Sequence, residues 1–217
     1  RSIDLEKAKI IEKNPNERNL NKFLTLRNSP VLNKYNFVYE NGILTLSKDN
    51  KNLISISAED QNERILLSNK LTELEGSLIK PIFLLKNKNF PFYDTSSLNN
   101  VFNSLSLINL NSIKDFENKI GEKVEFQRFR ANFYVDEMEA WKECNWIGKI
   151  IKINNISFKV EKNIPRCVAI NLKPKTDVKA LNLLQSLKKT YNHFDMGIYL
   201  TVIENGKINI GDKVILK

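Results

Sequence analysis

The feature that most constrains the fold is an Asn-Gly pair, Asn41-Gly42, set between runs of alternating apolar and polar residues. The surrounding stretch, residues 35–58, reads YNFVYENGILTLSKDNKNLISISA, and a second polar interruption, KDNKN, divides its later part. Such alternation is typical of strands with one buried face, and an Asn-Gly pair between two runs is the strongest short-range signal for a β-hairpin. The front of the chain is therefore predicted to consist of short, hairpin-connected strands.

Strand patterns return along the rest of the chain and outnumber helical ones. We expect strands within residues 77–87, 106–110, 129–136, 148–161 and 167–174, and two more within 196–216. Helices are expected at residues 97–105, 112–121 and 177–191. In the second of these, Ser112 is the expected N-cap and Gly121 the C-terminal stop. Short, turn-punctuated strands with few helices favour β-barrels, so the predicted fold class is mainly β with a few helices.

A connector that contains proline and serine, FPFYDTSS at residues 90–97, is the best candidate for a domain boundary. A chain of 217 residues is long enough for one large domain or two small ones. We therefore expect a smaller β domain in residues 1–89 and a β-barrel domain in residues 90–217.

The net charge of +9 comes from basic residues scattered along the whole chain. Because no basic stripe with interleaved aromatic side chains stands out, this pattern argues against a nucleic-acid partner. No stretch approaches the roughly 18–20 uninterrupted apolar residues of a membrane helix, and no signal peptide is recognisable. Two cysteines do not make a disulfide framework, so we expect Cys144 and Cys167 to be reduced and the protein to be cytoplasmic.

Ordinary catalytic motifs are lacking, which leaves Cys167 as the residue with the most distinctive surroundings. With one histidine and two cysteines, multi-histidine and four-cysteine metal sites are excluded, and neither a GxGxxG nor a Walker loop occurs. Cys167 directly follows Arg166; a guanidinium favours the thiolate form of a cysteine, and a thiolate is a good soft ligand for a transition metal. Two alternatives stay open: a Cys167–His193 dyad, and a small buried hydrophobe that opens a strand.

Several motifs in the second half occur in an order that resembles the MOSC domain, named after the C-terminal domain of molybdenum-cofactor sulfurases. They are RFR-x-N within EFQRFRANFYVD (125–136), W-x-G, R-C and P-x-T within 141–176, and a closing G-x-Y with G-x-I-x-x-GD-x-V within 191–216. Residues 106–121, SLINLNSIKDFENKIG, also resemble the segment that precedes RFR in the family. The resemblance spans roughly residues 90–217 and implies a β-barrel fold.

A weaker resemblance covers residues 1–89, which are similar to the β-barrel-like domain that accompanies MOSC in proteins like the mitochondrial amidoxime-reducing component. Its clearest piece is KFLTLRNSPVL (22–32). Relatives open with a strand that carries a Pro-x-Lys-Ser-like element and continue to an Asp-Arg pair, whereas this sequence starts at Arg1-Ser2. We therefore expect the N-terminal domain to be truncated and part of the family's cofactor-phosphate site to be missing.

The resemblance implies a molybdenum-cofactor (molybdopterin) site. In the family's reductases a cysteine ligates the molybdenum, a role that Cys167 would hold here, with Arg166 keeping it as a thiolate. Arg130 and Asn132 match the RFR-x-N motif and would contact the pterin or its phosphate. On weaker grounds, the resemblance also places near the pterin Arg128, Asn109 and Ser112. The alternative for Arg128 and Arg130 is an ordinary strand in which they pair with surface carboxylates. Four aromatic residues are interpreted as core: Phe133, Trp141, Trp146 and Tyr199.

Two functions follow from this resemblance. The first is a molybdenum-dependent oxidoreductase that reduces small N-hydroxylated or N-oxide substrates, with electrons from a separate iron–sulfur, haem or flavin protein, because this chain has no ferredoxin-like cysteine set. The second is a non-catalytic carrier of the cofactor or of sulfur, in which Cys167 bears a persulfide. The pyridoxal-phosphate domain of the sulfurases is not part of this sequence, so pyridoxal chemistry is not expected. A third alternative is a scaffold that binds no cofactor.

Overall fold

The computed structural model describes residues 4–14, 23–78, 80–87, 89 and 104–217. The chain divides into two compact units. The first consists of Arg1–Asp94 with Lys175–Val178, and the second of Thr95–Pro174 with Lys179–Lys217. The connector expected at residues 90–97 lies outside the described residues, so a boundary between residues 89 and 90 stays a prediction.

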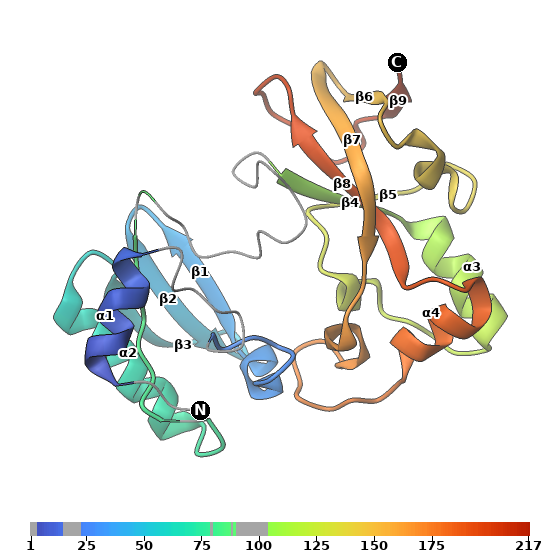
Figure 1. Ribbon diagram of the computed structural model, residues 1–217. Coiled ribbons are helices and arrows are strands. Elements are labelled where there is room, and N and C mark those ends of the chain that lie inside the picture. The colour runs from blue at the N-terminus through green and yellow to red at the C-terminus, as the bar shows by residue number, and fades with distance from the viewer. Residues whose placement is uncertain (1–3, 15–22, 79, 88, 90–103) are drawn as a thin grey trace. The chain divides into compact units, whose positions relative to one another are not determined.

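The first unit is built on the hairpins predicted from the Asn-Gly pair (Figure 1). Its sheet has the order β1-β2-β3, with antiparallel strands β1 (Asn36–Glu40), β2 (Ile43–Lys48) and β3 (Lys51–Ser57). Asn41 and Gly42 have φ angles of 49° and 83°. A two-residue type I′ turn needs positive φ at both positions, and it matches the twist of the strands that it joins. The hairpin prediction is confirmed.

The sequence patterns do not predict the two helices of the first unit, α1 (Leu5–Lys13) and α2 (Gln61–Leu74). A signal for α2 was nevertheless present. Asp60 caps this helix by accepting hydrogen bonds from the N–H groups of Asn62 and Glu63, at 2.7 and 3.0 Å, and Asp followed three residues later by Glu is a typical helix start. Leu67 and Leu71 of α2 pack against the sheet in a core that also contains Leu46, Ile56 and Leu78.

The strand expected within residues 77–87 is wrong for the part that the structure describes, which forms no strand at residues 80–87. Its backbone donors bond to side chains instead of a neighbouring strand. The N–H of Leu84 donates to Ser68 Oγ at 3.2 Å, and that of Lys86 donates to Glu12 Oε1 at 2.8 Å. Helix side chains therefore satisfy these groups, which an apolar sequence pattern alone does not reveal.

The second unit contains a six-stranded sheet of order β5-β4-β8-β7-β6-β9 that curls into an open half-barrel (Figure 1). All of its strand pairs are antiparallel except β4 with β5. The strands are β4 (Ser104–Asn109), β5 (Phe133–Val135), β6 (Ile150–Ile153), β7 (Ile156–Pro165), β8 (Asp195–Val202) and β9 (Val214–Leu216). The mainly β fold class is confirmed, and the strands expected within 106–110, 129–136 and 148–161 are found with shifted ends.

Successive residues of β4 point to opposite faces of this sheet and enter two separate cores. Leu107 belongs to a core inside the curl, with Phe158 and Leu200. Ile108 belongs to a core under the helices, with Phe116 and Leu187. Each of these side chains is at most 1% exposed. The sheet is therefore covered on one face by α3 and α4, next to which the site described below lies.

Both helices of the second unit differ from the predicted ranges. Helix α3 (Leu110–Ile120) ends at Gly121 as predicted, but its N-cap is Asn109, whose side chain accepts from the N–H of Asn111; the prediction of Ser112 as N-cap is wrong. Helix α4 (Leu183–Tyr191) has Asn182 at its N-cap position and begins later than predicted. In the segment before it, Lys179 forms a β-bridge with Leu172. The helix expected at 97–105 lies mostly outside the described residues.

Candidate functional site

Cys167 is exposed and stands where β7 ends and a short 3-10 helix, η7 (Val168–Asn171), begins. The strand predicted over residues 167–174 is wrong, because the chain turns here: the N–H of Ile170 donates to the carbonyl of Cys167 at 3.2 Å. Upstream, the N–H of Arg166 donates to the carbonyl of Phe194, the residue before β8, at 2.9 Å. The cysteine follows directly after this hydrogen bond. The interpretation of Cys167 as a buried hydrophobe is wrong as well.

Arg166 anchors the segment that carries Cys167. Its guanidinium donates to the carbonyl of Phe129 at 2.8 Å through Nη1 and to the carbonyl of Met196 at 2.8 Å through Nε, with a further contact from Nη2 to Met196. Burial lowers the pKa of Arg166 to about 10, so it stays charged at neutral pH. The structure thus places a half-buried positive charge next in sequence to an exposed thiol.

Arg128 holds the far end of the same segment. It is 2% exposed, donates from Nε to Glu125 Oε2 at 2.6 Å, and donates from Nη1 to the carbonyl of Asn171 at 3.0 Å. This ion pair also lowers the pKa of Glu125. The alternative reading of Arg128 was a strand residue paired with a surface carboxylate. Arg128 does pair with a carboxylate, which is half-buried, but it lies in a 3-10 helix, η5 (Phe126–Phe129), and not in a strand. The donors of Arg128 are thus directed into the protein.

Arg130 is exposed and lies beside Cys167. Its Nη1 donates to the carbonyl of Arg128 at 2.8 Å and to that of Ala169 at 3.2 Å, two residues past the cysteine. Although the residue is exposed, the surrounding chain removes part of the water from its guanidinium, and this desolvation lowers the pKa of Arg130. Among the charges that oppose this effect, the largest contribution comes from Cys167. The structure therefore brings a cation and a thiol together at the surface.

Asn132 lies two residues past Arg130, just before β5, and binds Ser106 of β4. Its Oδ1 accepts hydrogen bonds from the N–H and the hydroxyl of Ser106 at 2.9 and 2.8 Å, and its own N–H donates to the carbonyl of Ser106 at 3.1 Å. Within the described residues its amide NH2 makes no hydrogen bond, and the residue is exposed. Both N–H groups of this amide thus remain available for a ligand.

Asn109 and Ser112 lie apart from the cysteine, in a buried polar cluster around Glu143. Glu143 is 0% exposed and accepts from Ser112 Oγ at 2.7 Å and from Asn109 Nδ2 at 3.1 Å. Burial raises the pKa of Glu143 above its usual value. No sequence signal distinguishes this glutamate from a surface one, apart from the apolar residues around it in WKECNW. A cofactor contact from Asn109 or Ser112 stays a prediction, and the cluster gives both a structural role.

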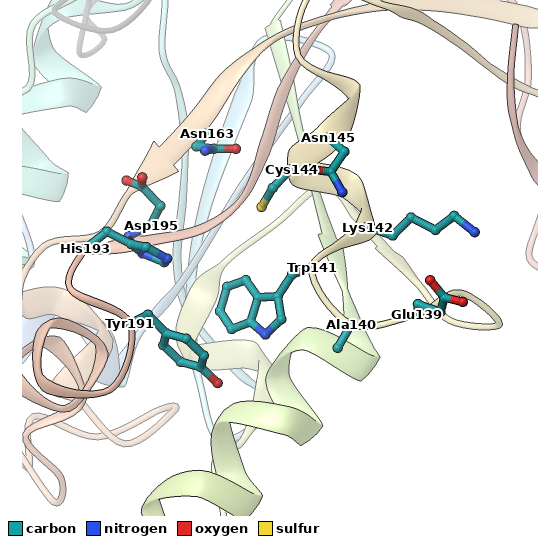
Figure 2. Close-up of a pocket in the computed structure, with 10 residues that line it drawn as sticks. All are labelled: Glu139, Ala140, Trp141, Lys142, Cys144, Asn145, Asn163, Tyr191, His193 and Asp195. Atoms are coloured by element: carbon teal, nitrogen blue, oxygen red, sulfur yellow. Dashed lines mark hydrogen bonds between the residues drawn. The ribbon is translucent and has the colours of Figure 1, made fainter.

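Cys144, rather than Cys167, shares a pocket with His193 (Figure 2). His193 Nδ1 accepts from the N–H of Asp195 at 3.1 Å, and among the described contacts no hydrogen bond links His193 to Cys167. The geometry thus gives no support to a Cys167–His193 dyad. Burial, together with the charges of Glu143 and Asp195, raises the pKa of Cys144 to about 12, so this thiol is neutral.

The aromatic residues interpreted as core divide into two groups. Trp146 is 6% exposed and belongs to the core inside the curl, with Phe133 packed against it. Trp141 is half-buried instead, lines the pocket, and donates from Nε1 to Asp115 Oδ2 at 2.8 Å. Tyr199 is half-buried in β8. The core interpretation is therefore incomplete for Trp141, because its ring forms a pocket wall.

Asp115 on α3 should make the stability of the protein depend on pH. Desolvation raises the pKa of Asp115. Hydrogen bonds from Trp141 and from Tyr191 (at 2.7 Å) and the ion pair with Lys119 at 3.1 Å lower it by more, so the net shift is downward. A depressed carboxyl pKa stabilises the fold above the unfolded value of about 4, and this contribution is lost as pH falls through the folded pKa.

We expect Asp115→Asn to lower the free energy of unfolding at pH 7 by about 2 kcal/mol, since two hydrogen bonds lose their charged acceptor. The difference from wild type should shrink as the pH falls below about 4, where Asp115 itself becomes protonated. Urea unfolding at pH 7, 5 and 3.5 measures it. A difference that stays constant across these pH values would contradict the role assigned to the carboxylate.

The described residues contain no group of three or more His, Cys, Asp or Glu side chains placed to hold a metal ion. A metal at Cys167 would therefore need most of its ligands from a cofactor and not from the protein. An exposed thiol, the cation of Arg130 and the free amide of Asn132 fit an anionic group of that kind. None of the described helices is both long and apolar enough to cross a membrane.

Part of the chain matches known proteins. The MOSC domain profile matches residues 95–215. Mitochondrial amidoxime reducing component 2 from Rattus norvegicus is 26% identical over 159 residues, which cover 66% of this chain and 44% of that protein. The chain thus spans less than half the length of this relative.

Two solved structures resemble the chain more distantly. YiiM from Geobacillus stearothermophilus matches with 15% identity and a TM-score of 0.42, over 52% of this chain and 53% of that one. A hypothetical protein matches with 18% identity and a TM-score of 0.40, over 52% of this chain and 50% of that one.

Proposed function

Because this chain belongs to the MOSC domain family, we propose that it binds the molybdenum cofactor through Cys167 and reduces N-hydroxylated or N-oxide substrates. The observation that carries the proposal is the exposed thiol of Cys167, which lies beside Arg130. Hydrogen bonds from Arg128, Arg130 and Arg166 to backbone carbonyls hold the segment that carries this thiol. The rat relative, by its name, reduces amidoximes, and the proposal extends an activity of that class to this chain.

Each residue near the thiol has a distinct task in this proposal. Cys167 ligates the metal, since a thiolate is the soft ligand that the site offers. Arg130 and Asn132 donate hydrogen bonds to the pterin or its phosphate, and the positive charge of Arg130 balances the negative charge of the phosphate. Arg166 and Arg128 position the segment by binding backbone carbonyls on either side of it. The bound metal would supply two-electron redox chemistry.

The overall reaction needs a partner. Reducing an N–OH group to N–H takes two electrons and two protons and releases water. Because the chain has two cysteines and one histidine, an iron–sulfur, haem or flavin protein has to deliver the electrons. The proposal also keeps residues 1–89 as an N-terminal MOSC-associated domain, which the three-stranded sheet of the first unit supports. It favours the cytoplasm, where thiols stay reduced.

The exposure of Cys167 also supports a second candidate, a sulfur or cofactor carrier. An exposed thiolate can accept a sulfur atom from a donor persulfide, which is left as a thiol, and pass it on. Pyridoxal phosphate is not expected in either candidate. The two differ in whether metal stays bound and whether substrate is reduced.

The test is elemental analysis together with a reductase assay, on protein made in a host that synthesises the cofactor. We expect about one molybdenum per chain and oxidation of a chemically reduced viologen dye that depends on an added amidoxime. Protein from a host that lacks cofactor synthesis is the control. Bound molybdenum without reduction, or a labile persulfide on Cys167 without metal, would favour the carrier. Neither metal nor persulfide, under conditions that load a known molybdoenzyme, would contradict both candidates and leave the scaffold alternative.

A further inference from the structure

The second unit has a pocket of about 340 Å³ that the proposed function does not use. It lies between the 3-10 helix η6 (Lys142–Trp146), the end of α4 and the facing ends of β7 and β8. Figure 2 shows six of its side chains around one open space: Trp141, Cys144, Asn163, Tyr191, His193 and Asp195. In the same view the side chain of Lys142 extends away from this space.

One wall of the pocket is aromatic. The ring centroids of Trp141 and Tyr191 lie 4.4 Å apart, and His193 lies 5.7 Å from Tyr191 in a stacked arrangement and 5.9 Å from Trp141 edge to face. Trp141 and Tyr191 are held in place by their hydrogen bonds to Asp115. The faces of such rings carry negative charge density and attract cations. One cation of the protein already makes such a contact: Lys119 Nζ lies over the ring of Tyr191, 4.6 Å from its centroid.

The opposite side of the pocket contains a hydrogen-bond acceptor that has no donor. Asn163 Oδ1 is buried and has no hydrogen-bond partner among the described residues. A buried carbonyl oxygen without a donor is destabilising, because it has given up its hydrogen bonds to water and gained none in return. A native protein retains such an atom more readily where a ligand supplies the donor. Asn163 Oδ1 therefore leaves one buried acceptor open to a ligand that carries an N–H or O–H group.

The charge in the pocket determines whether it favours a positively or a negatively charged ligand. The carboxylate of Asp195 is half-buried and forms no ion pair or side-chain hydrogen bond within the part of the chain that the structure describes. Its charge acts on Arg166 through space and opposes the fall in the pKa of that group. Cys144 beside it is a neutral thiol and brings no charge of its own. A carboxylate in a partly dehydrated pocket repels anions and attracts cations.

We propose that this pocket binds a small organic cation that carries N–H groups, such as a primary ammonium or a guanidinium. The aromatic faces and Asp195 would attract the positive charge, and an N–H of the ligand would bond to Asn163 Oδ1. A quaternary ammonium would fill the aromatic wall equally well but would leave Asn163 without its donor. The assignment is independent of molybdenum and of Cys167.

The experiment compares probe cations on the full chain without added cofactor. Ethylammonium, methylguanidinium and tetramethylammonium chloride are titrated, and binding is measured by calorimetry and by the fluorescence of Trp141. We expect the two N–H cations to bind at least about tenfold more tightly than tetramethylammonium, since only they satisfy Asn163. Equal affinity for all three, or no binding by the N–H cations at tens of millimolar, would overturn the proposal.

Two variants test the two contacts separately. Asp195→Asn should weaken all three cations by about tenfold, because it removes the charge. Asn163→Ala should weaken the N–H cations selectively and bring them closer to tetramethylammonium. The matched control is Asp136→Asn, which removes the same charge from an exposed position of the same unit. An equal effect of Asp136→Asn and Asp195→Asn would show a general charge effect and would overturn the site. If a variant fails to fold, the comparison of the three cations on wild type still decides.

Discussion

Cys167→Ser should remove the molybdenum and leave the fold intact. A serine hydroxyl does not ionise near neutral pH and is a harder, weaker ligand than a thiolate, so we expect metal content and reductase activity to fall by tenfold or more. Since Cys167 is exposed and its side chain makes no cap hydrogen bond, the free energy of unfolding should change by less than about 0.5 kcal/mol. Elemental analysis, the viologen assay and urea unfolding on the same preparation measure all three quantities.

The matched control is Cys144→Ser, which changes the only other cysteine in the same way. Cys144 is half-buried and neutral, so this variant should keep its metal, its activity and its fold. The assignment would be refuted by the reverse pattern, with metal lost from Cys144→Ser and retained in Cys167→Ser. Loss from both variants would point to a requirement for two thiols, which the single-ligand site does not allow.

Gly197→Ala should be the most destabilising small substitution in the second unit. Gly197 lies in β8 with φ of +81°, and a Cβ there would stand 2.5 Å from the carbonyl oxygen of Leu107 and 2.6 Å from Ile108 Cγ1. The carbonyl belongs to the neighbouring strand β4 and cannot swing away as a flexible side chain would. We expect a loss of about 3–5 kcal/mol in the free energy of unfolding, a large share of the typical total of about 5–15 kcal/mol.

The same Cβ would also approach Arg166 Nη2 to 3.3 Å. Because Arg166 anchors the segment before Cys167, any Gly197→Ala protein that folds should also retain less cofactor. Gly148→Ala is the matched control: its φ of +80° is nearly the same, but nothing lies within 4 Å of its Cβ position. It should lose about 1–2 kcal/mol from backbone strain alone. Equal losses in the two variants, measured by soluble yield and urea unfolding, would show that the contact with β4 is unimportant.

Local signals predicted the parts of the fold whose geometry a few adjacent residues dictate. Asn41-Gly42 specified a hairpin because both residues tolerate positive φ. Gly121 ended α3 for the same reason, with φ of 69°. Where the pattern was apolar without such a signal, the strand prediction failed. In residues 80–87 side chains accept hydrogen bonds from the backbone N–H groups, and in residues 168–171 a tight turn does so.

The candidate site shows the same division. The Arg-Cys pair and the RFR-x-N motif drew attention to Cys167, Arg130 and Asn132 from the sequence alone, and the structure places the cysteine and Arg130 together at the surface. The sequence ranked Asn109 and Ser112 lower but still placed them at the same site, whereas they lie at a buried glutamate. It also did not distinguish the buried Arg128 and the half-buried Arg166 from the exposed Arg130.

What the sequence by itself determined is the mainly β class, the turns and the residue around which the proposed chemistry is built, because these depend on backbone preferences and on the character of single side chains. The tertiary structure alone decided which arginine faces the thiol, which cysteine is exposed and which carboxylate is buried. These outcomes depend on how β4, β7 and β8 bring residues 107, 129, 166 and 196 together. The burial of a charged group follows from such long-range packing, and no local pattern encodes it.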